Sequence, residues 1–98
     1  MEHEQHFQHI IEKVKTLQKD YPEIEKIVLF GSRARGNHRY NSDIDLCVFA
    51  PEEFRDRFFT FAGDIEELHT YYSFDVLFWH NLSNNVLRQD ILEEGIQL

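Results

Sequence analysis

The chain has 98 residues, a formal net charge of −8, 42% hydrophobic residues and one cysteine. This length supports one hydrophobic core, so we expect a single domain over residues 1–98, and the apolar content excludes a disordered chain. The acidic balance argues against direct DNA binding, because DNA-binding proteins present a basic face to phosphates. No apolar run approaches the ~18 residues of a membrane span and the N-terminus does not resemble a signal peptide, so we expect a cytoplasmic protein that does not enter a membrane.

The first part of the chain predicts a helix, a strand and a short second helix. Apolar residues recur every three or four positions over residues 4–19, which is typical of an amphipathic helix. Residues 24–30 end in a continuously apolar run, which predicts a strand buried on both faces. A Gly-Ser pair follows, and residues 32–36 are expected to form a short helix directly after that turn.

The second part predicts two more strands, each followed by a helix. Alternation in the strand over residues 43–49 places Asp43, Asp45, Cys47 and Phe49 on one face and Ile44, Leu46 and Val48 on the other. A helix follows over residues 51–68, then an aromatic strand over 71–79, and a last helix begins at Ser83 or Asn84 and ends at Gly95. This order predicts an α/β or α+β fold, with a small mixed β-sheet and helices packed on one face.

Three aspartates interrupt apolar strands, where this residue type is rare. Asp43 and Asp45 are two positions apart and therefore point to the same side of a strand, about 7 Å apart at their Cα atoms. Asp75 interrupts the third strand and completes a set of three carboxylates if the two strands are neighbours. An oxygen-only set of this kind favours Mg²⁺ or Mn²⁺ over zinc. The alternative is that Asp43 and Asp45 face solvent at a strand end and that Asp75 pairs with an arginine.

The Gly31-Ser32 pair predicts a turn that approaches a ligand closely. Glycine lets the backbone come near a bound group, and the first N–H groups of a following helix attract phosphate oxygens. The positive charges Arg33 and Arg35 lie just beyond the turn in an otherwise acidic chain. A local basic cluster of this kind suits a small anionic ligand better than a polymer.

The motifs "GSRARG" and "NSDIDL", with ten residues between Ser32 and Asp43, resemble the signature of the DNA polymerase β-like nucleotidyltransferase superfamily. Within it, the short chain and "GSRARG" are similar to the minimal nucleotidyltransferases (MNT) of HEPN–MNT toxin–antitoxin pairs. The segment "SFDVLFW" matches the third carboxylate strand of that superfamily. The resemblance implies a polymerase β palm-like fold. The insert at His38, Arg39 and Tyr40 is less familiar, and no role is assigned to it.

The resemblance also implies roles for individual residues. Asp43 and Asp45 would bind two Mg²⁺ ions, and Asp75 would ligate the catalytic metal and help to activate the acceptor hydroxyl as a base. The triphosphate of ATP would lie against five residues that share the glycine–serine motif or flank it: Gly31, Ser32, Arg33, Arg35 and Ser42. The reaction implied is in-line nucleotidyl transfer, in which metal ions stabilise both the attacking and the leaving oxygens.

The acceptor is expected to come from a second molecule, because larger relatives carry an acceptor-binding domain for which this chain has no room. The resemblance implies a HEPN-domain toxin as partner and the transfer of AMP from ATP to a tyrosine of that toxin. Two alternatives remain open: a binding module that neutralises its partner by contact through surface aromatics such as Phe59, and nucleotidyl transfer to a small molecule. The residues also leave the base preference and homo-oligomerisation open.

Overall fold

The computed structural model describes residues 2–39, 42–68 and 72–98. Its elements follow the predicted order: α1 (Glu2–Gln18), β1 (Lys26–Phe30), α2 (Ser32–Arg35), β2 (Ile44–Phe49), α3 (Arg55–Glu66), β3 (Phe74–Phe78), α4 (Asn85–Glu94) and β4 (Ile96–Gln97). Short 3-10 turns precede α3 at Glu52–Phe54 and follow β3 at Trp79–Asn81. The first residue of the predicted third strand, Tyr71, lies outside the described residues, as does Tyr40 of the insert.

The four strands form one sheet in the order β3-β2-β1-β4. Strand β1 is antiparallel to both of its neighbours, β2 and β4, whereas β2 and β3 run parallel. Helix α3 makes the crossover that a parallel pair requires. The predicted mixed sheet is therefore confirmed, and β2 is its internal strand beside the edge strand β3.

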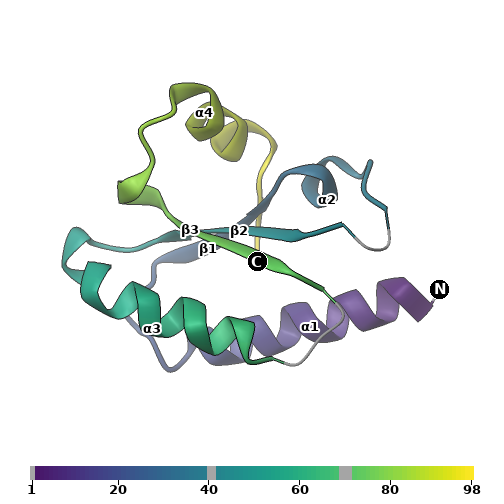
Figure 1. The fold of residues 1–98 in the computed structure, drawn as a ribbon, viewed down its shortest axis with the longest axis horizontal. Coiled ribbons are helices and arrows are strands. Elements are labelled where there is room, and N and C mark those ends of the chain that lie inside the picture. Colours follow the sequence, from purple (N-terminus) through teal and green to yellow (C-terminus); the bar gives the residue numbers. More distant parts are fainter. Residues whose placement is uncertain (1, 40–41, 69–71) are drawn as a thin grey trace.

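One face of the sheet packs on α1 and α3, which lie side by side below it in Figure 1. The predicted alternation of β2 is confirmed here, because its three aliphatic residues at even positions are fully buried in this cluster: Ile44, Leu46 and Val48. Aromatic residues of α3 and of the turn before it complete the packing, among them Phe54 and Phe61. This face holds the larger of the two hydrophobic clusters.

Helix α4 lies on the opposite face of the sheet (Figure 1). Its Ile91 packs with the side chains of β1 and β2 that alternation turns away from α1, including Val28 and Cys47. The ring of Trp79 stacks on Phe49 with centroids 4.7 Å apart and extends this second cluster. Helices therefore cover both faces and not the single face that the sequence predicts, because β1 and the second half of β2 are apolar on both sides and need cover on each.

Helix α4 begins and ends at residues that the sequence identifies. The side chain of Asn84 accepts hydrogen bonds from the backbone N–H groups of Val86 and Leu87, and the helix ends before Gly95. The chain then adds β4, a two-residue strand that the sequence pattern does not predict, and the N–H of Leu98 donates to the carbonyl of Ile27. Within the described ranges, no helix has the length and apolar character needed to cross a bilayer.

Candidate functional site

The parallel pairing of β2 and β3 brings two of the three predicted carboxylates together. Asp45 and Asp75 are direct partners in the register, so both project from the same face, the one that α4 covers further along the strands. Across the antiparallel ladder, Asp45 also faces Phe30, the last residue of β1. The neighbouring strands on which the three-carboxylate prediction depends are therefore confirmed.

Asp43 lies immediately before β2 and two positions from Asp45, on the same side of the chain. The Asp43 and Asp75 side chains are exposed and that of Asp45 is partly buried. Asp75 is more accessible than its apolar neighbours suggest, because β3 is the edge strand of the sheet. Burial raises the pKa of the Asp45 carboxyl, and the negative charges of Asp75 and Asp43 raise it further, whereas Arg35 and Arg33 oppose the shift.

Gly31 connects the end of β1 to α2 in a conformation that only glycine adopts readily, with φ 76° and ψ −155°. A Cβ atom at this position would stand 2.3 Å from Oδ2 of Asp45. The absence of a side chain at Gly31 therefore lets the turn approach the carboxylate directly. Ser32 begins the four-residue helix α2, and Gly36 ends it in the left-handed conformation with φ 82°.

The two arginines of α2 have different surroundings. Arg35 is exposed, and its guanidinium lies 4.0 Å from the carboxylate of Glu94 on α4. Arg33 is only 7% exposed, and its guanidinium donates from Nε and Nη2 to the carbonyl oxygen of Ser42, over 3.1 and 2.9 Å. Residues 33 and 35 point in opposite directions because two steps along a helix turn a side chain by about 200°.

Ser42 is the residue that joins the basic loop to the carboxylates. Its Oγ accepts a hydrogen bond from the backbone N–H of Arg39 over 2.9 Å, and its own N–H donates to the Arg39 carbonyl over 3.0 Å. The hydroxyl of Ser42 therefore holds the backbone of the basic loop at Arg39, and Ser42 itself directly precedes Asp43 in the sequence. The side chains of His38 and Arg39 are exposed in that loop.

The donor set fits a hard divalent cation by its chemistry, because all three side chains offer carboxylate oxygens. Burial raises the pKa of the Asp45 carboxyl, and the charges of Asp75 and Asp43 raise it further, so a divalent cation would offset the repulsion among the three carboxylates. As the side chains stand, no three His, Cys, Asp or Glu residues within the described part of the chain gather closely enough to hold a metal ion. Aspartate turns about only two side-chain bonds, so the backbone positions of Asp43, Asp45 and Asp75 determine whether the set can converge.

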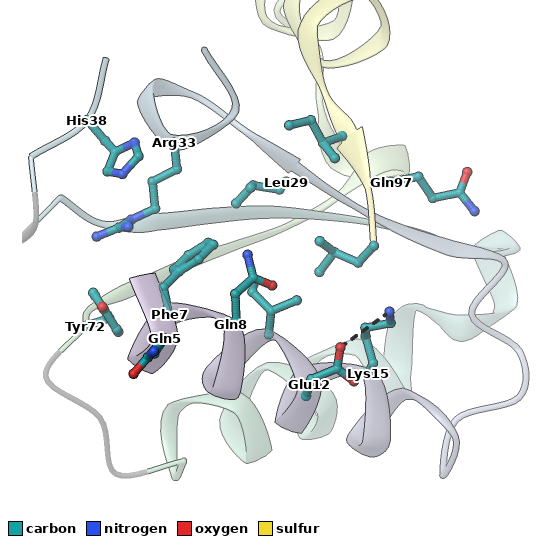
Figure 2. Close-up of a pocket in the computed structure, with 13 residues that line it drawn as sticks. Gln5, Phe7, Gln8, Glu12, Lys15, Leu29, Arg33, His38, Tyr72 and Gln97 are labelled. Atoms are coloured by element: carbon teal, nitrogen blue, oxygen red, sulfur yellow. Dashed lines mark ion pairs between the residues drawn. The ribbon is translucent and has the colours of Figure 1, made fainter. Parts of the chain in front are cut away.

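A groove of about 1140 Å³ lies on the other side of the sheet, between α1 and the end of the chain. Figure 2 shows its lining, which includes Phe7, Leu29 and Gln97 and does not include any of the three aspartates. Arg33 and Tyr72 lie at one end of this groove. The groove is therefore separate from the carboxylate face, although Arg33 is close to both.

The mixed sheet and its helices have the fold of the nucleotidyltransferases. A family model described as "Polymerase beta, Nucleotidyltransferase" matches residues 12–98, and the chain belongs to this family. The sequence-based resemblance is thereby confirmed at the level of the family. Among curated proteins, no sequence matches this chain.

Several solved structures with a similar fold are chains of toxin–antitoxin complexes. A chain of a toxin–antitoxin structure with AMP-PNP is 27% identical, with a TM-score of 0.70 over 88% of this chain and 69% of that chain. A chain of the MntA–HepT toxin–antitoxin structure is 25% identical, with a TM-score of 0.66 over 92% of this chain and 69% of that chain. A chain of the tri-AMPylated Shewanella oneidensis HEPN toxin in complex with MNT antitoxin is 24% identical, with a TM-score of 0.66 over 92% and 69%, and shows the fold alone. The resemblance to the MNT members of HEPN–MNT pairs agrees with these neighbours.

Sequence reasoning missed two contributions to this region. Phe7 and Tyr72 surround the guanidinium of Arg33, and Glu94 lies beside Arg35. Each partner comes from an element distant in sequence, and its distance along the chain from the motif does not indicate that the two are in contact. These contacts become visible only once the topology of the sheet is known.

Proposed function

We propose that the chain is a Mg²⁺-dependent nucleotidyltransferase that transfers AMP from ATP to a tyrosine hydroxyl of a HEPN-domain toxin and thereby acts as its antitoxin. The observation that carries this proposal is the register that makes Asp45 and Asp75 partners beside the Gly31 turn, in a chain of the nucleotidyltransferase family. The toxin–antitoxin neighbour with AMP-PNP and the MntA–HepT neighbour support the choice of nucleotide and partner. We place the reaction in the cytoplasm, because its substrate is ATP. We treat residues 1–98 as the one domain that carries it out.

Each side chain has a role in this proposal that its position supports. Asp43, Asp45 and Asp75 would hold two Mg²⁺ ions, for which Mn²⁺ could substitute, and these ions would supply charge neutralisation for the triphosphate. Gly31 and Ser32 bring backbone N–H groups to the phosphates, and the exposed Arg35 adds positive charge. Ser42 keeps the loop in place beside the nucleotide.

The chemical step exchanges one bond for another at the α-phosphorus. The acceptor oxygen forms a bond to the α-phosphorus as the bond to the β-phosphate oxygen breaks, and pyrophosphate leaves with that electron pair. The hydroxyl proton passes to the carboxylate of Asp75, which is exposed at the edge strand and therefore accessible to an acceptor on another molecule.

The test is to incubate the chain with ATP, Mg²⁺ and the HEPN protein encoded beside it, and to measure the intact mass of that protein. We expect AMP adducts on the partner, and we expect Asp43→Ala and Asp45→Ala to reduce the rate of adduct formation at least about a hundredfold. Asp56→Ala is the matched control, because Asp56 is an exposed aspartate in the first turn of α3, outside the site. Adduct formation by Asp45→Ala at the rate of the wild type would refute the proposal.

Two outcomes would favour the alternatives. Neutralisation of the toxin that persists in Asp43→Ala and Asp45→Ala would indicate a binding module, and the exposed Phe59 on α3 would then be the first residue to substitute. ATP consumed without an adduct on the partner would indicate a small-molecule acceptor. The same mass measurement, combined with a pyrophosphate assay, separates these outcomes from the proposed reaction.

A further inference from the structure

We propose that Arg33 is a positioning residue that fixes the backbone of Asp43 for metal binding, and that it does not contact the nucleotide phosphates. The inference rests on the proposed function, since it assigns to Arg33 a place in the same site. It concerns a residue of the "GSRARG" motif whose charge alone indicates a phosphate ligand.

The contacts of Arg33 direct its guanidinium away from a ligand and toward the chain itself. The side chain is 7% exposed, and two of its nitrogens donate to the same Ser42 carbonyl oxygen. Its Cζ atom lies over two rings, 4.8 Å from the centroid of Phe7 and 4.7 Å from that of Tyr72. Figure 2 shows Arg33, Phe7 and Tyr72 together at one end of the groove.

Asp43 depends on this contact because it lies outside the hydrogen-bonded ladder. Strand β2 begins at Ile44, whose N–H donates to the carbonyl of Ser73 over 2.8 Å. On the other side of Asp43, the Ser42 carbonyl is held by Arg33. The backbone of Asp43 is thus anchored immediately before and after the residue, whereas Asp45 is held within the ladder by partners on both sides.

The two rings connect Arg33 to the other carboxylate strand. Phe7 belongs to α1, and Tyr72 precedes β3 by two residues, in the segment that leads to Asp75. The guanidinium therefore joins α1, α2, the loop before β2 and the segment before β3. Disturbing it should displace Asp43 first, because Arg33 holds the carbonyl of the residue that directly precedes Asp43.

A lysine at this position should not replace the arginine. The guanidinium can donate two bonds to one oxygen while its carbon lies over the rings, and an ammonium group cannot keep both contacts in this geometry. We therefore expect Arg33→Lys to keep the charge and lose most of the positioning. Arg33→Met, which keeps much of the length and loses the charge and the donors, should lose all of it.

The test measures Mn²⁺ binding to the full chain by electron paramagnetic resonance, without nucleotide or partner. Loss of a residue that orients a metal ligand weakens metal binding about 10–100-fold. We expect a loss of this size for Arg33→Met, a loss of at least about fivefold for Arg33→Lys, and a smaller loss of about two- to threefold for Phe7→Leu, which removes one of the rings.

The matched control is Arg57→Met. Arg57 also lies over a ring, 4.7 Å from the centroid of Tyr21, and also makes a side-chain bond, to Glu23, but it is on α3 and away from the aspartates. A role in stability alone would lower the melting temperature of both methionine variants and leave the Mn²⁺ affinity of the folded protein unchanged. If Arg33→Met does not fold, Arg33→Lys and Phe7→Leu decide the question.

The outcomes separate this inference from the proposed function. If the wild-type chain binds Mn²⁺ and the Arg33 variants bind it equally well, the inference is overturned and the proposed function stands. If the wild-type chain binds Mn²⁺ and the variants bind it weakly, the inference holds even when no AMP transfer is found. A wild-type chain that binds no Mn²⁺, or Arg33 variants that weaken ATP binding while Mn²⁺ binding is unchanged, would also overturn the inference.

Discussion

Replacing Gly31 with alanine should be one of the most damaging single-methyl additions in this chain. The backbone at Gly31 has φ 76° and ψ −155°, a region that costs other residues about 1–3 kcal/mol. The new Cβ would also stand 2.3 Å from Oδ2 of Asp45, and relieving such overpacking costs about 1 kcal/mol or more. Together these terms predict a loss of about 3 kcal/mol in the free energy of unfolding, or roughly 12–24 °C in melting temperature.

A second glycine supplies the control. Gly36 has a similar φ of 82°, but a methyl group added there would meet nothing within 4 Å, so Gly36→Ala should cost only about 1 kcal/mol. Urea unfolding of both variants, followed by circular dichroism, measures the difference. The steric part is isolated by a double-mutant cycle with Asp45→Ala, in which Gly31→Ala should cost about 1 kcal/mol less.

Two results would refute this reasoning. If Gly31→Ala destabilises the protein no more than Gly36→Ala, the backbone at Gly31 is not restricted to glycine. If its cost is the same with and without the Asp45 side chain, the turn does not press against the carboxylate. A coupling below about 0.5 kcal/mol would be within the range that independent sites show.

Three further predictions concern the scaffold. Tyr21→Phe removes the hydrogen bond that the Tyr21 hydroxyl donates to Asp64, and should lower the free energy of unfolding by about 1 kcal/mol at pH 7. That bond raises the pKa of Tyr21 from 10.0 to about 12, so the stabilisation is complete below pH 10 and is lost as the pH rises through 12. Urea unfolding of both chains over this range measures it, and a difference in free energy of unfolding that does not change with pH would contradict the prediction. Burial raises the pKa of the Cys47 thiol to about 12, so iodoacetamide at pH 8 should label Cys47 only through unfolding, and rapid labelling of the folded chain would contradict its burial. Asn84→Ala should lower the free energy of unfolding by about 1 kcal/mol through loss of the helix cap, whereas Asn84→Asp should stay close to wild type. Thermal unfolding of the three chains measures this, and equal stability of all three would show that the cap is not needed.

The strand pattern around the aspartates could be predicted from the sequence because alternation is a local property. The positions of Asp43 and Asp45 on one side of β2, and the burial of Ile44 and Leu46 on the other, follow from a period of two residues. The register between Asp45 and Asp75 could not be predicted in this way. Thirty residues separate the two positions, and only the neighbouring parallel strands place them opposite each other.

The arginines show where a charge pattern is insufficient. Arg33 and Arg35 are equivalent in the motif, but a helix of four residues turns their side chains in opposite directions. One lies among aromatic residues and the other remains exposed. Helix α4 was predicted, but its place on the second face of the sheet was not, because that place depends on the second apolar face that β1 and β2 present to it.

Because Asp45 and Asp75 are partners only in the folded sheet, a ligand that needs both residues binds only the folded fraction of the chain. In an unfolded chain, thirty residues separate two positions by a root-mean-square distance of roughly 30 Å, so the pair does not exist there. A cation that bridges them therefore binds the native state alone and stabilises it by mass action, by about 2.7 kcal/mol when its free concentration is a hundred times the dissociation constant. Changes in the supply of such an ion would then alter the lifetime of the folded protein, independently of any reaction that it carries out.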